Sequence, residues 1–165
     1  MLQRSFKSAF TLIELLLVLL ILTFVVAMVG PQLRGFTAGR TTRNTANSIL
    51  AMTHYARTQA VTQGLTYRLN YNGQTRSLWI SYQSGNADVK PGNDFATPLN
   101  LADSIKIDTD IPNKQDGSQY IEFHPTGRTE PATITLTDNF GATVQIACSS
   151  ATELFRIVPP SEVTK

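Results

Sequence analysis

Residues 10–30 of the chain read FTLIELLLVLLILTFVVAMVG, and Pro31 follows them. Only Thr11, Glu14 and Thr23 interrupt the apolar character of this stretch. At ~1.5 Å per residue, a helix of this length reaches about 30 Å, the thickness of a bilayer core. Because lipid offers no hydrogen bonds to an open backbone, the stretch should be helical. The sequence therefore predicts one membrane-spanning helix over residues 10–30.

A secretory signal peptide is the competing interpretation, because Arg4 and Lys7 precede the apolar run. Three features argue against it. The run exceeds the usual h-region of about 7–15 residues, and no small-residue cleavage site stands at its far end, residues 28–32. A carboxylate, Glu14, also lies inside it. These features favour an anchor that the protein retains.

Glu14 needs a partner, because a carboxylate near the centre of a membrane helix costs about 2.5–3.5 kcal/mol. The apolar stretch itself contains no base. A cut before Phe10 would create an α-ammonium about one helical turn from Glu14, in the same subunit or a neighbouring one. The alternative is that Glu14 merely reaches the membrane interface and has no role.

Residues 9–18, AFTLIELLLV, resemble the class III prepilin signal of type IV pilins and secretion pseudopilins. The resemblance implies that a prepilin peptidase cleaves between Ala9 and Phe10 and methylates the Phe10 amine. It implies that Glu14 sets the register of subunits in the filament, and that the helix kinks at Pro31. The chain departs from the family pattern at Ala9, where glycine is usual.

The same resemblance implies a cleaved leader at residues 1–9 and a single-pass protein of the inner membrane. The C-terminal domain would then lie in the periplasm. Counting positive charges does not settle this orientation, because Arg34, Arg40 and Arg43 follow the apolar run on its far side.

A second helical pattern begins near Thr42 and gives an N-terminal helix over residues 10–64, with Gly64 as its stop. Small and apolar residues recur on one face of this pattern. They are Ala46, Ile49, Leu50, Thr53, Ala56, Ala60 and Val61. Arg57 lies close to that face, so its stem should pack there while its head reaches the rim.

Period-two patterns follow over residues 65–165 and predict a small antiparallel β domain. Asn72-Gly73 predicts the turn of the first hairpin, and residues 83–98 read as a polar loop. The predicted strands are 66–71, 77–82, 120–123, 133–137, 143–148 and 154–158. The expected fold class is α+β, a long N-terminal helix packed on β structure, as in pilins.

Residues 56–64, ARTQAVTQG, and 121–128, IEFHPTGR, resemble the GspH/FimT minor pseudopilins. The resemblance implies a structural, non-enzymatic subunit of a type II secretion pseudopilus or a type IV pilus-like filament. Its partners would be other pilins or pseudopilins, the prepilin peptidase, and a secretion or pilus assembly platform. The alternatives are a DNA-binding minor pilin for DNA uptake, a single-pass envelope protein and a membrane-tethered enzyme.

The net charge is only +2, so the overall charge does not indicate that the protein binds nucleic acid. The DNA-uptake branch of the family uses clustered arginines near the C-terminus, whereas residues 154–158 carry only Arg156. Residues 32–76 hold six arginines and no acid, while residues 77–165 hold eleven acids against six bases. Such halves could pair between subunits of a polymer, or could simply be two solvated faces.

Residues that could carry other chemistry do not form a site in the sequence. His54 and His124 have no carboxylate or cysteine at ligand spacing, so we expect no metal, cofactor or catalysis. Asp108-Thr109-Asp110 lacks the spacing of a calcium loop and reads as a solvated loop. The lone Cys148 follows alternating Val144 and Ile146, which predicts a small buried hydrophobe.

Overall fold

The computed structural model describes residues 11–85, 87–92 and 97–158, and the side chains of all of these except residues 29–38. The chain divides into two compact units, residues 1–37 and 38–165. One helix, α1 (Leu12–Gln63), contributes to both units.

Helix α1 has defined signals at both ends. Thr11 precedes its first residue, and the amide of Glu14 donates a hydrogen bond to Thr11 Oγ1 at 3.3 Å, as an N-cap requires. At the other end Gly64 adopts φ 69°, and its amide donates to the carbonyl of Ala60 at 3.0 Å. Since only glycine takes this left-handed conformation without strain, Gly64 ends the helix as predicted.

In the described part of the chain, ten strands follow α1, all in the second unit. They are β1 (Tyr67–Asn72), β2 (Ser77–Ser84), β3 (Ala87–Val89), β4 (Leu99–Asn100), β5 (Ile105–Asp110), β6 (Asn113–Gln115), β7 (Ser118–Phe123), β8 (Ala132–Asp138), β9 (Thr143–Cys148) and β10 (Arg156–Val158).

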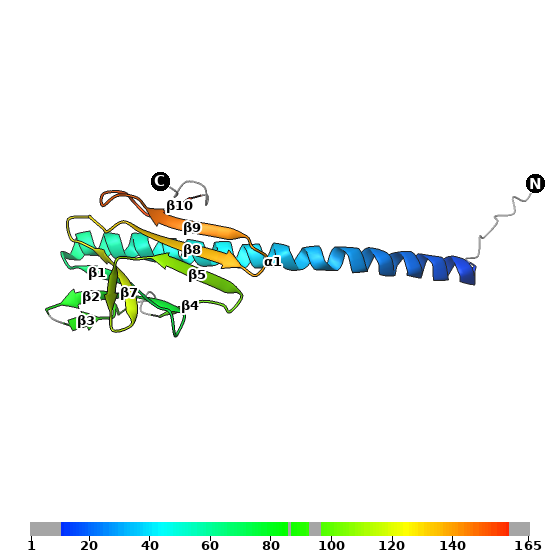
Figure 1. Cartoon of the computed structure of the whole chain (residues 1–165), viewed down its shortest axis with the longest axis horizontal. Coiled ribbons are helices and arrows are strands. Elements are labelled where there is room, and N and C mark those ends of the chain that lie inside the picture. The colour runs from blue at the N-terminus through cyan, green and yellow to red at the C-terminus, as the bar shows by residue number, and fades with distance from the viewer. Residues whose placement is uncertain (1–10, 86, 93–96, 159–165) are drawn as a thin grey trace, which may run out of the picture. The chain divides into compact units, whose positions relative to one another are not determined.

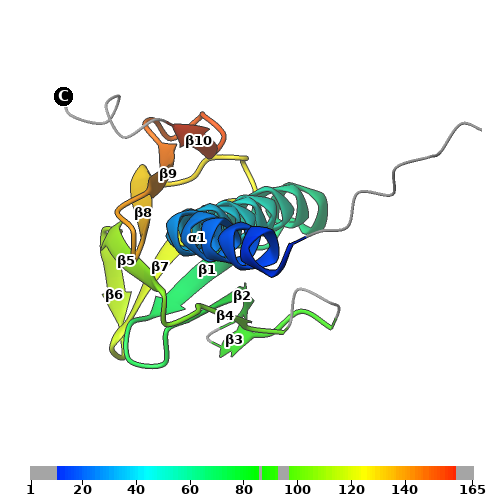
Figure 2. The same ribbon diagram turned by 90° about the vertical axis from the view of Figure 1, so that its right-hand side faces the viewer.

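The strands form two antiparallel sheets beside the helix (Figure 1). The first sheet has the order β3-β2-β1-β7-β6, with β4 also paired to β2. The second has the order β10-β9-β8-β5. Viewed down the helix, the second-unit part of α1 lies between the two sheets (Figure 2). The predicted α+β class, a helix packed on antiparallel β structure, is therefore what the structure shows.

One hydrophobic core joins the helix to both sheets. The helix contributes its small face, on which Ala46, Ile49, Ala56 and Ala60 are fully buried. Small side chains let the backbone of a helix approach a sheet closely, and the larger residues of the sheets then fill the core. These are Tyr67, Leu69, Leu78, Ile80, Ile121 and Phe123 from the first sheet and Ile105, Ile134, Leu136 and Ile146 from the second. Val61, predicted on this face, is instead 54% exposed.

Four strands escaped the sequence prediction: β3, β4, β5 and β6. Residues 83–98 were expected to be a loop, yet they include β3, which pairs with the end of β2. The stretch with Asp108 and Asp110 is strand β5 and not a loop, because Ile105 and Ile107 turn inward while the aspartates point to solvent. Strand β6 forms a hairpin with β7.

The turn of the first hairpin lies where the sequence placed it, between β1, which ends at Asn72, and β2, which begins at Ser77. The left-handed residue is Arg76, with φ 51°. Asn72 Oδ1 accepts hydrogen bonds from the amides of Gln74 and Thr75, at 2.8 and 3.0 Å, and this closes the loop.

Candidate assembly site

The first turn of α1 places Glu14 three residues after the N-cap Thr11. This is the Thr-x-x-Glu spacing of a capping box, in which an acidic side chain lies beside the free amides of the first turn. The helix dipole also favours a negative charge there. Glu14 is therefore well placed by the helix itself, and it is exposed rather than buried in its own chain.

Apolar side chains surround the N-terminal part of α1 on every side. Leu12 is 80% exposed, Val18 47% and Met28 77%, and the other large apolar residues between them lie within this range. Thr23 does not interrupt the surface, because its hydroxyl donates to the carbonyl of Leu20 at 2.7 Å. A helix that is apolar all round belongs in an apolar environment, made either of lipid or of other protein.

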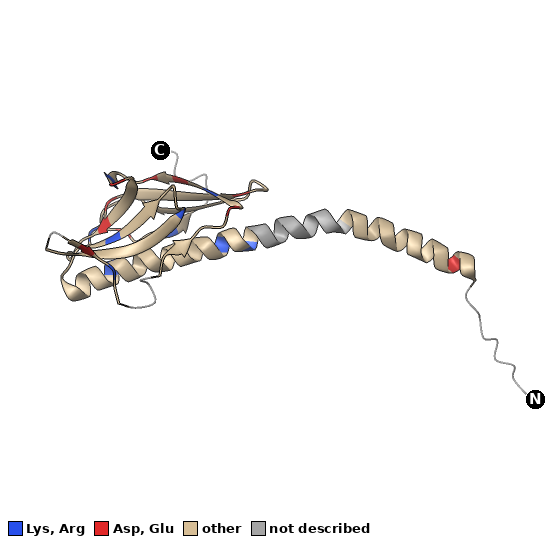
Figure 3. Cartoon of the chain, turned by 90° about the horizontal axis from the view of Figure 1, so that it is seen from below, with Lys and Arg blue, Asp and Glu red and all other residues tan. Residues whose placement is uncertain are grey.

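Charged side chains are placed very differently in the two units (Figure 3). Glu14 is the only charged residue between Thr11 and Met28, whereas acids and bases are spread over the β domain and the adjoining part of the helix. Among the described residues, no helix is long and apolar enough to cross a membrane. The predicted membrane segment begins at Phe10 and ends at Gly30, and both lie outside the residues whose side chains are described.

The remaining predicted site residues are not tested by the structure. Ala9 and Phe10, at the expected cleavage and methylation point, lie outside the described residues. Pro31 lies within α1, but its side chain is outside the described set. Cleavage, methylation, the kink and the register role of Glu14 therefore stay predictions.

Two side chains of α1 contact backbone carbonyls of the segment between β9 and β10. Arg57 donates hydrogen bonds to the carbonyl of Thr152, at 2.9 Å, and to that of Glu153. His54 Nε2 is 3.1 Å from the carbonyl of Phe155, the residue before β10. The head of Arg57 thus reaches backbone carbonyls at the rim, in agreement with the sequence pattern. These contacts fix the segment between β9 and β10 against the helix.

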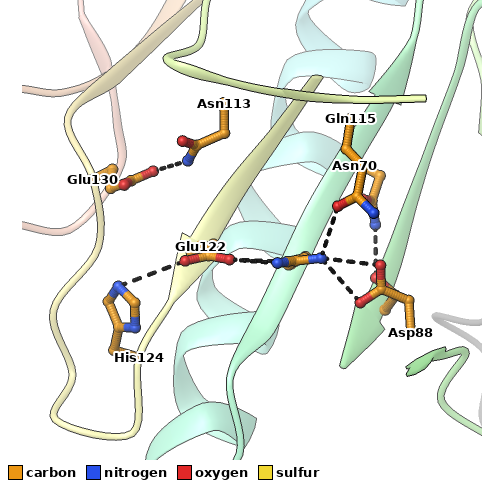
Figure 4. A network of polar contacts seen from close by, with 9 residues as sticks. Asn70, Asp88, Asn113, Gln115, Glu122, His124 and Glu130 are labelled. Atoms are coloured by element: carbon orange, nitrogen blue, oxygen red, sulfur yellow. Dashed lines mark hydrogen bonds and ion pairs between the residues drawn. The ribbon is translucent and has the colours of Figure 1, made fainter. Parts of the chain in front are cut away.

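Arg68 is the centre of a polar network that the sequence did not indicate; its partners Asp88, Gln115 and Glu122 are labelled in Figure 4. It is 8% exposed and lies on the face of the first sheet that turns away from α1. Its guanidinium donates to Glu122 Oε1 at 2.7 Å, to Asp88 Oδ2 at 3.0 Å and to Gln115 at 3.4 Å. It also lies 4.4 Å from the ring centroid of Tyr120.

The network links four strands, since its members come from β1, β3, β6 and β7. Burial alone would lower the pKa of Arg68, but the hydrogen bond that Arg68 donates to Glu122 and the charge of Asp88 outweigh it and raise the pKa. Arg68 therefore remains a cation at any physiological pH. Its partners are far away in the sequence, so the period-two pattern could place Arg68 on the outer face but could not reveal them.

Solved structures share this architecture. Two structures of the minor pseudopilin EpsH from the type II secretion system of Vibrio cholerae resemble the chain, with TM-scores of 0.63 and 0.61. They are 14% and 12% identical to it, span 74% and 73% of this chain, and are themselves covered over 96% and 98%. The type IV minor pilin FimU of Pseudomonas aeruginosa has a TM-score of 0.56 at 17% identity, over 77% of this chain and 95% of its own. The fold is therefore that of a pilin-like protein.

Sequence families give the more particular assignment. The family described as type II transport protein GspH matches residues 45–152, and the prokaryotic N-terminal methylation motif matches residues 4–30. The chain belongs to the GspH family. This confirms the resemblance to the GspH/FimT minor pseudopilins. No curated protein matches the chain.

Proposed function

We propose that the chain is a structural subunit, a minor pseudopilin, that is cleaved once, methylated and assembled into a filament. The filament is a type II secretion pseudopilus or a type IV pilus-like fibre, and the subunit performs no catalysis. The observation that carries the proposal is the methylation motif over residues 4–30, which includes the part of α1 whose apolar side chains are exposed on all sides.

The apolar helix would have two successive environments. Before assembly, residues 10–30 anchor the protein in the inner membrane, with the β domain in the periplasm. During assembly the same side chains pack against the helices of other pilins or pseudopilins on the assembly platform. Because these side chains pass from lipid and not from water, close van der Waals packing between the helices, rather than the hydrophobic effect, holds a helix-lined filament core together.

Glu14 would act at the moment of assembly. Prepilin peptidase cleavage between Ala9 and Phe10 creates a cationic, N-methylated terminus four residues before Glu14. In an apolar filament core, an unpaired carboxylate is costly, so Glu14 selects the axial position at which a methyl-Phe10 ammonium meets it. The N-cap at Thr11 fixes the helix start, and this keeps the carboxylate close to that terminus.

Mass spectrometry of the N-terminus tests processing. The full chain is produced with and without a prepilin peptidase in the same membrane. We expect the peptidase to remove residues 1–9 and to add one methyl group to Phe10. An uncut Met1, or a cut near Gly30 as for a secretory signal, would overturn the proposal.

Glu14→Ala separates processing from assembly. We expect this variant to be cleaved normally but to be lost from sheared filaments, with at least a tenfold lower incorporation measured by immunoblotting. Thr23→Ala is the matched control, because it changes another polar position of the same apolar stretch whose hydroxyl only bonds its own helix. Normal incorporation of Glu14→Ala would refute the register role.

A further inference from the structure

The outer face of the first sheet carries a pocket of about 180 Å³ beside the Arg68 network. We call it the Trp79 pocket. It is lined by Asn70, Trp79, Ser81, Asp88, Gln115, Asp116, Ser118 and Tyr120. Strands β1, β2, β3, β6 and β7 and the β6–β7 turn supply these residues. The pocket lies wholly within residues 38–165 and shares Asp88 and Gln115 with a second hollow at Arg68.

The pocket presents a hydrogen-bond acceptor. Asn70 is 7% exposed, and its Nδ2 donates to Ser81 Oγ at 2.9 Å and to the carbonyl of Trp79 at 3.4 Å, which fixes the amide in place. Asn70 lines the pocket, and its other polar atom, Oδ1, can only accept a hydrogen bond, so it is suited to a ligand that donates.

The Arg68 network shows what this face of the sheet binds. There a guanidinium lies over an aromatic ring, Tyr120, and bonds two carboxylates and one amide. The Trp79 pocket offers the same set of groups a few residues away: an aromatic side chain, a carboxylate at Asp116, and amides at Asn70 and Gln115. Arginine donates five N–H groups, accepts none and stacks on aromatic rings, which matches such a set.

The charge around the pocket is negative. Arg68 offsets only one of its two carboxylate partners, Asp88 and Glu122. Asp116 adds a further negative charge, and it is exposed at the β6–β7 turn with φ 50°. A cationic ligand is therefore attracted, whereas a neutral saccharide would gain nothing from this charge.

We propose that the Trp79 pocket binds an arginine side chain of a neighbouring subunit. That the arginine comes from a second subunit rests on the proposed filament. That the pocket binds an arginine side chain does not. The chain's own composition fits this occupant, because arginines but no acids occur between residues 32 and 76. Arg43, exposed on α1, is an example of an arginine that a second copy can present.

Intrinsic fluorescence tests the pocket directly, because Trp79 is the only tryptophan of the chain. The full chain in detergent is titrated with N-acetyl-arginine amide and, in parallel, with the uncharged N-acetyl-citrulline amide. We expect saturable, millimolar quenching by the arginine compound alone, weakened as salt rises from low to physiological concentration. Calorimetry of the same titrations gives a reading that does not depend on the fluorophore.

Two variants locate the site. Asp116→Asn should weaken binding about fivefold, the effect of one partly exposed ion pair. Asp108→Asn removes an equally exposed carboxylate from β5 in the other sheet and should leave binding unchanged. Equal loss in both variants would mean that only the net charge matters, which contradicts a built pocket.

Two results would overturn the inference: saturation by the citrulline compound as well as by the arginine compound, or no saturation in either measurement. Neither of them bears on cleavage or filament assembly. Conversely, if the chain binds arginine but is never cleaved or methylated, the inference about the pocket is supported and the proposed function is refuted.

Discussion

Arg68→Met removes a guanidinium but keeps an unbranched stem over the ring of Tyr120. The change leaves two carboxylates without their cation on a nearly closed face of the sheet. Removing one member of a fully buried ion pair costs about 3–5 kcal/mol. The side chains of Glu122 and Asp88 retain 20% and 38% exposure, so water solvates part of the exposed charge. We therefore expect the free energy of unfolding to fall by about 2–3 kcal/mol.

A double-mutant cycle shows whether the network is the cause. Glu122→Gln alone should destabilise the domain, because it weakens the bond to Arg68. In the Arg68→Met background the same change should instead restore about 1 kcal/mol, because it removes an unpaired buried charge. Asp88→Asn should have a smaller effect in either background, since its carboxylate is the more exposed one.

Urea unfolding of the full chain in detergent, followed by the fluorescence of Trp79, measures these values. Arg43→Met serves as the control, because it removes an exposed arginine of α1 and should change stability by less than about 0.5 kcal/mol. If Arg68→Met is as stable as this control, or if Glu122→Gln destabilises both backgrounds equally, the network does not stabilise the fold as described.

Three more outcomes follow from the second unit. Arg57→Ala should lower the free energy of unfolding by about 1–2 kcal/mol and raise hydrogen exchange in β10, whereas Thr58→Ala, on the exposed side of the helix, should do neither. Burial raises the pKa of the Cys148 thiol above 9.0, so maleimide should label it only after urea unfolding; rapid labelling of the folded chain would contradict this. Burial also raises the pKa values of Tyr67 and Tyr71 above 10.0. The unfolded chain therefore loses these protons at a lower pH than the folded chain, and the free energy of unfolding should fall as the pH rises from about 9 through 11. Urea midpoints that stay constant over that range would refute this prediction.

Long periodic patterns made the helix and the first hairpin predictable. The 3–4 spacing from Ala46 to Ala60 describes the buried face of α1, and a glycine able to take positive φ marks its end. Strand β5 was missed for a physical reason: Asp108 and Asp110 occupy only its solvent side, and their charge hid the inward alternation that begins at Ile105. Strands as short as β3 and β6 carry too few residues for any period.

The polar network lay beyond the sequence for a different reason. Arg68 meets Asp88, Gln115 and Glu122 across 20, 47 and 54 residues of chain, respectively. No local pattern encodes such pairings, because they depend on the order in which the strands join the sheet. The N-terminal site is the opposite case: Ala9, Phe10 and Glu14 form a contiguous motif, and the sequence remains the stronger guide to their role.

The solitary, enclosed Cys148 has a practical consequence for mapping this protein among its neighbours. Because the native thiol is covered in the folded domain, it need not be mutated away before a second cysteine is introduced. A single thiol placed at Asp116, for example, could be cross-linked or spin-labelled in place inside an intact fibre. Each position on the β domain can thus report in turn on which chain lies opposite it.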